Sequence, residues 1–233
     1  MKKINLSTLI LSIVYIAAQA QSLNQGQLHG SVEIDAQYYN PDSLIGAPAV
    51  PSKMLLNSYA KLDYTNGKIS AGVRYEAYDN ALQGYDARYN GNGIAYKYIR
   101  YTDSTMDITV GNFYEQFGSG IVLRSYWDYQ LGVDNSIDGV RLKYNPYKGI
   151  YIKGIIGHQR YYWAEGTGLV GGADGEINLN ELVSSWAKAK TQIILGGSFV
   201  SKYQVPDNTT YNVPANVGAS AGRITLNRGG FSL

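Results

Sequence analysis

The residues best suited to chemistry lie in the glycine- and aromatic-rich stretch 111–132, GNFYEQFGSGIVLRSYWDYQLG. Within it, Glu115, Arg124 and Asp128 could form a polar cluster, with Ser119 as a nucleophile. A nucleophile elbow needs a glycine two residues before its serine, and Phe117 occupies that position. The sequence therefore favours a long loop that constricts a pore or binds a partner over a catalytic centre. The candidate residues of this loop are Tyr114, Glu115, Gln116, Arg124, Trp127 and Asp128.

Residue types that bind metals or act as nucleophiles are scarce in the rest of the chain. There is no Cys, and His29 and His158 are the two histidines, so we expect neither a metal site nor a cofactor. A catalytic pair of Ser119 and His158 depends on the fold, because their spacing alone says nothing about it. The formal net charge of +2 gives no indication of a nucleic-acid partner. We predict that the protein is not an enzyme.

A second set of candidates consists of charged residues that recur at alternate positions of strand-like segments. Such side chains could line a pore and select solutes by charge, or they could pair with one another across neighbouring strands. The two signs are nearly balanced, which favours pairing and argues against a strongly ion-selective pore. The candidate lining residues are Glu33, Asp35, Lys61, Asp63, Arg74, Glu76, Arg141 and Lys143, with Asp174 and Glu176 further along.

The segment that positions the first of these charges is Gln27–Tyr39, in which small and apolar residues alternate with polar ones. A period of two indicates a strand with one apolar and one polar face. The segment is also long, because soluble strands usually have about 5–6 residues and tilted membrane strands need about 9–11. A soluble β-sandwich would show the same alternation. Strand length and the abundance of Tyr (22) and Gly (27) favour a membrane barrel.

The rest of the chain repeats this pattern. Strands are expected over residues 54–65, 68–78, 92–102, 105–113, 136–145, 149–160, 172–180, 192–203 and 215–227, with one or two helical turns over 181–190. Asn66-Gly67 predicts a tight hairpin turn with positive φ at both residues. Long loops are expected after every odd-numbered strand and mostly short turns after the even-numbered ones, which is typical of outer-membrane barrels. The predicted fold is an all-β, antiparallel up-and-down transmembrane β-barrel with about ten strands.

The N-terminal segment predicts export. Residues 1–20 contain Lys2 and Lys3, a short apolar run and a final Ala-Gln-Ala, as in a cleaved secretory signal peptide. Residues 21–233 would then form the barrel domain, located in the bacterial outer membrane. Phe231-Ser232-Leu233 reads as the opening of an eleventh strand, and bacterial barrels have even strand numbers. We expect an N-terminal fragment of a larger barrel; a complete ten-stranded barrel with a short tail is the alternative.

Three segments carry a resemblance to a known family. NFYEQFGSG (112–120), LGVDNSIDG (131–139) and YKGIYIKG (147–154) resemble an uncharacterised family of Bacteroidota outer-membrane proteins, and the similarity extends through LGGSFVSKYQ (195–204). The resemblance implies a barrel in the outer membrane, larger than this chain. It implies no activity for particular residues.

Two functions remain open at this point. The first is a channel or transport barrel for small solutes, constricted by the loop that begins at Tyr114. The second is a non-enzymatic binding or assembly barrel that presents tyrosine-rich loops to a surface or periplasmic protein partner, or to a secretion apparatus. In both cases the lipid of the outer membrane is an expected partner.

Overall fold

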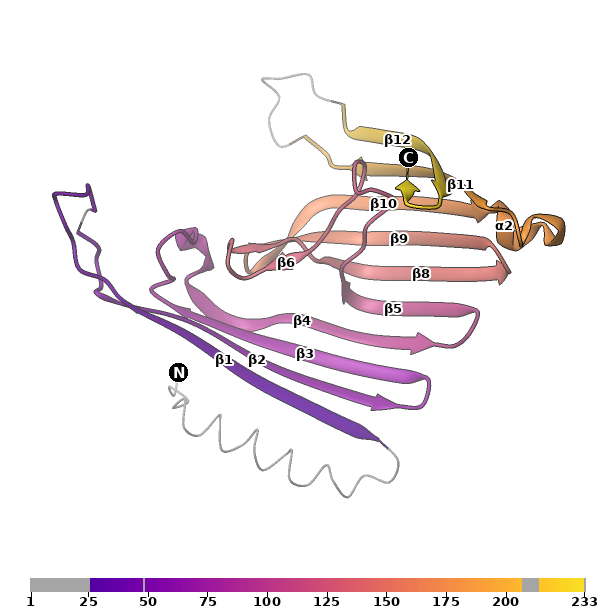
Figure 1. Ribbon diagram of the computed structural model, residues 1–233. Coiled ribbons are helices and arrows are strands. Elements are labelled where there is room, and N and C mark those ends of the chain that lie inside the picture. The colour runs from indigo at the N-terminus through magenta and orange to yellow at the C-terminus, as the bar shows by residue number, and fades with distance from the viewer. Residues whose placement is uncertain (1–25, 48, 207–213, 233) are drawn as a thin grey trace. The chain divides into compact units, whose positions relative to one another are not determined.

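The protein is mostly β and antiparallel, as the sequence predicts. The computed structural model describes residues 26–47, 49–206 and 214–232 (Figure 1). Eleven strands pair in chain order, from β1 to β13, with β6 and β7 forming a separate small hairpin. This order does not return to β1, so the described strands form an open sheet rather than the closed barrel expected from the sequence. The strands of the sheet are β1 (Gln27–Tyr38), β2 (Met54–Asn66), β3 (Ile69–Asp79), β4 (Gly91–Thr102), β5 (Met106–Phe113), β8 (Ile137–Tyr147), β9 (Ile150–Tyr161), β10 (Ala164–Asn178), β11 (Thr191–Tyr203), β12 (Asn216–Arg228) and β13 (Phe231–Ser232).

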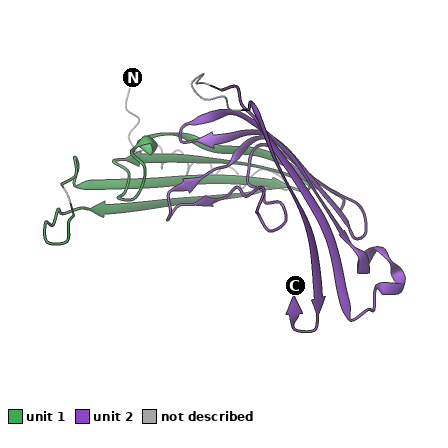
Figure 2. Cartoon of the chain, turned by 90° about the horizontal axis from the view of Figure 1, so that it is seen from above, with its two compact units in different colours: residues 1–99 green, residues 100–233 purple. Residues whose placement is uncertain are grey.

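The remaining elements are short. Strands β6 (Trp127–Asp128) and β7 (Val133–Asp134) lie in the connection between β5 and β8. A 3₁₀ turn, η1 (Ala87–Tyr89), precedes β4. The helical turns predicted over 181–190 are present slightly earlier, as α2 (Leu179–Leu182) and η2 (Ser184–Trp186). The chain divides into two compact units, residues 1–99 and 100–233, which Figure 2 colours separately.

In the described part of the chain, no helix is both long enough and apolar enough to cross a membrane. The signal peptide predicted over residues 1–20 lies outside the described residues, and so does Leu233.

The predicted turn at Asn66-Gly67 is present but is displaced by one residue. Asn66 is the last residue of β2 and pairs with Ile69, so Gly67 and Lys68 form the two-residue loop. Gly67 has φ of +56°, whereas Asn66 stays in the strand conformation. The prediction of positive φ at both residues was therefore wrong. The glycine alone supplies the left-handed backbone conformation that the turn needs.

The prediction of a long glycine-rich loop over residues 161–171, between the strands expected over 149–160 and 172–180, was also wrong. Tyr161 pairs with Ala164, so β9 and β10 are joined by a two-residue turn, in which Tyr162 has φ of +56°. Strand β10 runs through the glycines, with a register shift between Glu165 and Leu169. Glycines are usually depleted in strands, which is why composition alone predicted a loop here. In this strand one of them, Gly172, leaves room for an aromatic side chain, as the site below shows.

The register in the second unit gives its sheet two chemically different faces. Asp107, Lys143, Lys153, Asp174 and Ser198 occupy successive paired positions on β5, β8, β9, β10 and β11. We call the side of the sheet that carries this row, together with Arg141 and Arg223, the polar face. The opposite side, which we call the apolar face, carries Val110, Val140, Ile152, Ile156, Ile177, Leu195, Phe199 and Ile224, and all of these are exposed.

In the first unit the register confirms the predicted alternation. Glu33 lies opposite Tyr59 and Asp35 opposite Asn57, and Lys61 lies opposite Arg74. The charged residues of β1 and β2 therefore share one side of the sheet with Arg74 and Glu76 of β3. Val32 and Ile34 point to the other side and are exposed.

Candidate functional site: the 114–135 segment on the polar face

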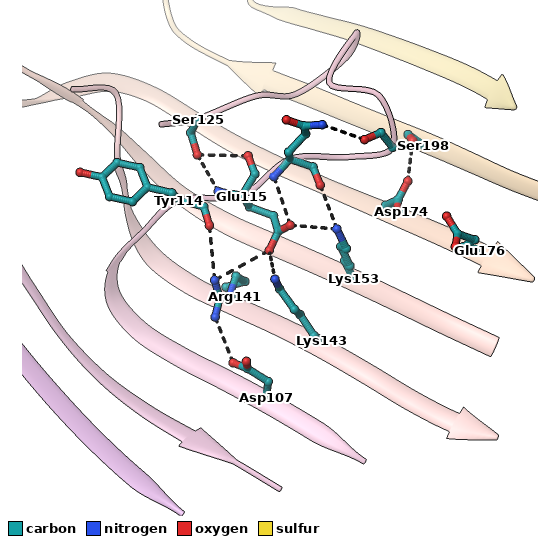
Figure 3. Close-up of polar contacts among 12 residues, drawn as sticks. Asp107, Tyr114, Glu115, Ser125, Arg141, Lys143, Lys153, Asp174, Glu176 and Ser198 are labelled. Carbon is teal, nitrogen blue, oxygen red and sulfur yellow. Dashed lines mark hydrogen bonds and ion pairs between the residues drawn. The ribbon is translucent and has the colours of Figure 1, made fainter. Parts of the chain in front are cut away.

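The irregular segment 114–135 folds onto the polar face of the second unit, where Glu115 anchors it (Figure 3). The Glu115 carboxylate lies 3.0 Å from the Nζ atoms of both Lys143 and Lys153, and 3.8 Å from Arg141 Nη1. Its side chain is only 3 % exposed. A buried carboxylate surrounded by cations on two adjacent strands fixes the start of the segment in place.

Backbone hydrogen bonds strengthen the same anchor. Ser125 Oγ accepts a hydrogen bond from the Glu115 amide at 2.8 Å, and the Ser125 amide donates to the Glu115 carbonyl at 2.9 Å. Lys153 also donates to the Gln116 carbonyl, and Arg141 donates to the Tyr114 carbonyl. The segment therefore folds back on itself at this point: its outgoing part is bonded to the sheet, and its returning part is bonded to the outgoing part through Ser125.

The electrostatics at Glu115 favour the ionised carboxylate. Burial raises the pKa of this carboxyl group, but the ion pairs and hydrogen bonds from Lys143 and Lys153 lower it by more. The net result is a pKa below the usual value of a glutamate. The anchor is consequently charged at neutral pH.

A second ion pair holds the end of the segment. Arg160 Nη1 lies 2.6 Å from Asp134 Oδ2, and both side chains are buried. Asp134 also accepts hydrogen bonds from the Tyr114 hydroxyl and from the Ser136 amide. The Arg160 guanidinium lies 5.7 Å from the centre of the Trp163 ring. The two ends of the segment are thereby joined to each other and to β9.

Between these ionic anchors the segment buries an aromatic side chain against the sheet. Phe117 is 1 % exposed and packs with Phe113, Ile137, Ile155 and Val170. A Cβ atom at Gly172 would lie only 2.9 Å from the Phe117 ring, so glycine is required there. The apolar cluster on an otherwise charged face explains why the segment lies flat on it.

The neighbouring strands carry a further polar group. Arg223 on β12 pairs with Asp174 at 2.7 Å and with Glu176 at 3.2 Å, and Ser198 donates to Asp174 at 2.6 Å. Gly118, with φ of +52°, approaches Arg223 so closely that a Cβ atom would lie 2.7 Å from Nη1. The segment thus extends from β5 across the sheet as far as β12.

The other predicted loop residues have separate local roles. Arg124 pairs with Gln116 through a β-bridge, and its guanidinium lies over the Tyr126 ring. Trp127 belongs to the β6–β7 hairpin and contacts the Tyr129 ring. Asp128 accepts hydrogen bonds from the amides of Gln130 and Leu131 and so stabilises the hairpin turn. The structure gives Glu115, Arg124 and Asp128 these distinct partners instead of one shared cluster.

Among the predicted lining residues, Arg141 and Lys143 belong to this site. Asp174 and Glu176 lie beside it, paired with Arg223, and the remaining ones lie in the first unit. There Arg74 Nε is 2.7 Å from Glu76 Oε1, and the Tyr98 hydroxyl donates to Asp63. Both Arg74 and Glu76 are buried, so charge pairing within the sheet is present there. Glu33, Asp35 and Lys61 occupy the same side of that sheet and are partly exposed.

Sequence reasoning missed Lys153, Asp107, Asp134, Arg160 and Arg223. Lys153 lies opposite Lys143 across the β8–β9 hairpin, which is a local connection, but the register shift between Tyr144 and Tyr147 reverses the parity counted from the turn. A count from the turn would therefore have placed Lys153 on the other side of the sheet. Asp107 lies opposite Lys143, but the irregular 114–135 segment joins β5 to β8, so parity could not have been counted between these two residues. The pairing of Arg160 with Asp134 has no comparable local signal, because it depends on the path of the segment.

The structure does not bring Ser119 and His158 together. His158 lies on the same side of β9 as Ile156, and its Nδ1 is 3.0 Å from the Gly166 carbonyl oxygen, whereas the segment that contains Ser119 lies on the polar face. The two residues do not form a pair. Over the described ranges, no group of three or more His, Cys, Asp or Glu side chains could hold a metal ion.

The fold and the site define a mostly β protein whose long internal segment is anchored on a charged sheet face. The chain belongs to a family of unknown function, DUF6029, whose model matches residues 1–233. No curated protein matches the sequence. The family description gives neither location nor activity, so the outer-membrane location stays a prediction.

Proposed function

We propose that the sheet is the wall of an outer-membrane β-barrel that passes small solutes, with the 114–135 segment as its constriction. The observation that carries this proposal is the distribution of polarity in the second unit. Its apolar face is exposed, whereas the charged residues of its polar face are largely buried or ion-paired. A water-soluble sheet protein would bury the apolar face, whereas a barrel in lipid exposes it.

The exposed apolar residues form continuous rows across strands. Val110 pairs with Val140, and Val140 with Ile156. A second row joins Ile177, Leu195 and Ile224. Exposed apolar surface that continues over several strands is characteristic of a membrane-facing or partner-facing surface. Strands of 11 to 15 residues, such as β8 and β10, are long enough to cross a bilayer.

The 114–135 segment supports a role as a constriction. It is held at both ends by ion pairs and, next to the first of them, by the buried side chain of Phe117, so it stays over the polar face instead of moving freely. In a barrel whose polar face lines the lumen, such a segment narrows the passage. We accordingly propose a non-enzymatic function.

One observation favours the binding or assembly function. In the first unit, Tyr59, Tyr78, Tyr85 and Tyr89 pack against one another with ring centroids 5.4 to 6.0 Å apart. Next to them is a cavity of about 190 Å³, lined by residues of the loops before β2 and after β3. Tyr85 belongs both to this tyrosine cluster and to the lining of the cavity, and a cavity next to aromatic side chains suits contact with a surface or periplasmic protein partner.

Conductance distinguishes the two functions. The protein is purified from the outer-membrane fraction in its folded, heat-modifiable form and added to a planar lipid bilayer. Steady single-channel steps are the result expected for a solute channel. A folded protein that inserts but never conducts would leave the binding function and exclude the channel.

A further inference from the structure

We propose that the polar face carries an anion-attracting patch, formed by Arg100, Lys143 and Lys153, which gives the proposed channel a preference for small anionic solutes such as carboxylates and phosphates. This inference rests on the proposed channel function and specifies its solute class. The chain as a whole is almost neutral, with 20 Lys and Arg against 18 Asp and Glu. The preference arises from which charges are exposed.

The cluster contains more cations than carboxylates. Asp107 binds Arg100 and Arg141, and Glu115 binds Lys143, Lys153 and, at 3.8 Å, Arg141. Four cationic side chains therefore surround two carboxylates. The carboxylate on the next strand, Asp174, is held by Arg223 and Ser198.

The carboxylates of this cluster are more deeply buried than its cationic side chains. The side chains of Glu115 and Asp107 are only 3 % and 13 % exposed. Those of Arg100, Lys143 and Lys153 are 41 %, 38 % and 30 % exposed. Water in contact with this part of the polar face therefore meets ammonium and guanidinium groups, while their counter-charges lie behind them.

The lysines also keep hydrogen-bonding capacity for a ligand. An ammonium group has three donors, and Lys143 uses one of them on Glu115. Lys143 and Lys153 are directly paired residues of β8 and β9, so their ammonium groups converge on the same carboxylate. A carboxylate or phosphate oxygen can approach this pair from the solvent side.

The test measures ion selectivity in a planar bilayer under a potassium chloride gradient at low ionic strength. The reversal potential of the wild-type protein should have the sign that a preference for chloride over potassium produces. Lys143→Gln should lower the ratio of chloride to potassium permeability by about two- to threefold, because two unit charges separated by about 7 Å interact in water by about one RT, less with salt. Arg100→Gln, on a different strand, should act in the same direction.

Lys148→Gln is the matched control, because Lys148 is an exposed lysine in the turn of the same β8–β9 hairpin. Its selectivity should equal that of the wild type. Cation preference in the wild type, or equal selectivity of all the variants, would overturn the anion patch while leaving the channel intact.

A measurement that needs no conductance separates the two proposals. Inorganic phosphate is titrated calorimetrically into the folded protein in detergent at low salt. Binding that is weakened by Lys143→Gln but not by Lys148→Gln supports the patch even if no channel opens. Absence of such binding in a protein that also shows no chloride preference would refute the patch.

Discussion

At the scale of single residues, substitution of Glu115 should lower stability, because its carboxylate forms ion pairs with lysines on both β8 and β9. Removal of one member of a buried ion pair leaves its partners uncompensated. Since Lys143 and Lys153 are partly solvated, we expect Glu115→Gln to lower the free energy of unfolding by about 1–3 kcal/mol. Urea titration of the folded protein in detergent measures this change. Glu165→Gln, an exposed carboxylate on β10, should change it by less than about 0.5 kcal/mol.

The same residue predicts a pH dependence. The pKa of Glu115 is lower in the folded protein than its usual value of 4.5, so its contribution to stability is complete above that value. The contribution is lost as the pH falls through the lowered pKa of the folded state. Fluorescence of Trp127, in a variant with the other tryptophans replaced by Phe, should report release of the segment in acid. If Glu115→Gln shows the same acid transition, Glu115 is not the group that titrates.

At the scale of elements, the 114–135 segment is held by burial of Phe117 as well as by charge. Phe117→Ala should cost about 3–5 kcal/mol of local stability, because it empties a packed apolar cluster. The freed segment should then be cut faster by trypsin after Arg124, which mass spectrometry of the fragments detects. Ile121→Ala, at a position 84 % exposed on the same segment, is the control and should leave the cleavage rate unchanged.

The strands could be predicted from the sequence and the path of the segment could not. Alternation of polar and apolar residues is a local property, so it located β1, β2, β3 and β9 to within a few residues. Strand β10 was predicted too short, because its glycines are typical of a loop, although Gly172 makes room for Phe117. The site depends on contacts distant in the chain: Glu115 meets Lys153, 38 residues later. No local pattern specifies such a pairing.

At the scale of the whole molecule, a barrel wall requires that lipid contacts the apolar face. Ile156 is 52 % exposed on β9, and arginine there would be nearly neutral if water contacted this face. In a bilayer the same change should destabilise the protein by about 2–4 kcal/mol. Urea unfolding in lipid vesicles measures the difference between Ile156→Arg and the control Ile121→Arg. Equal stability of the two variants would argue against lipid at this face.

The most direct test of the central claim is the location and folded state of the native protein in cell fractions. The outer-membrane fraction is run on a gel with and without heating, since folded barrels resist unfolding by detergent in the cold. An outer-membrane barrel should stay in the membrane after carbonate extraction, and its band should shift on heating. A protein recovered in the soluble fraction, with a single heat-independent band, would contradict this expectation.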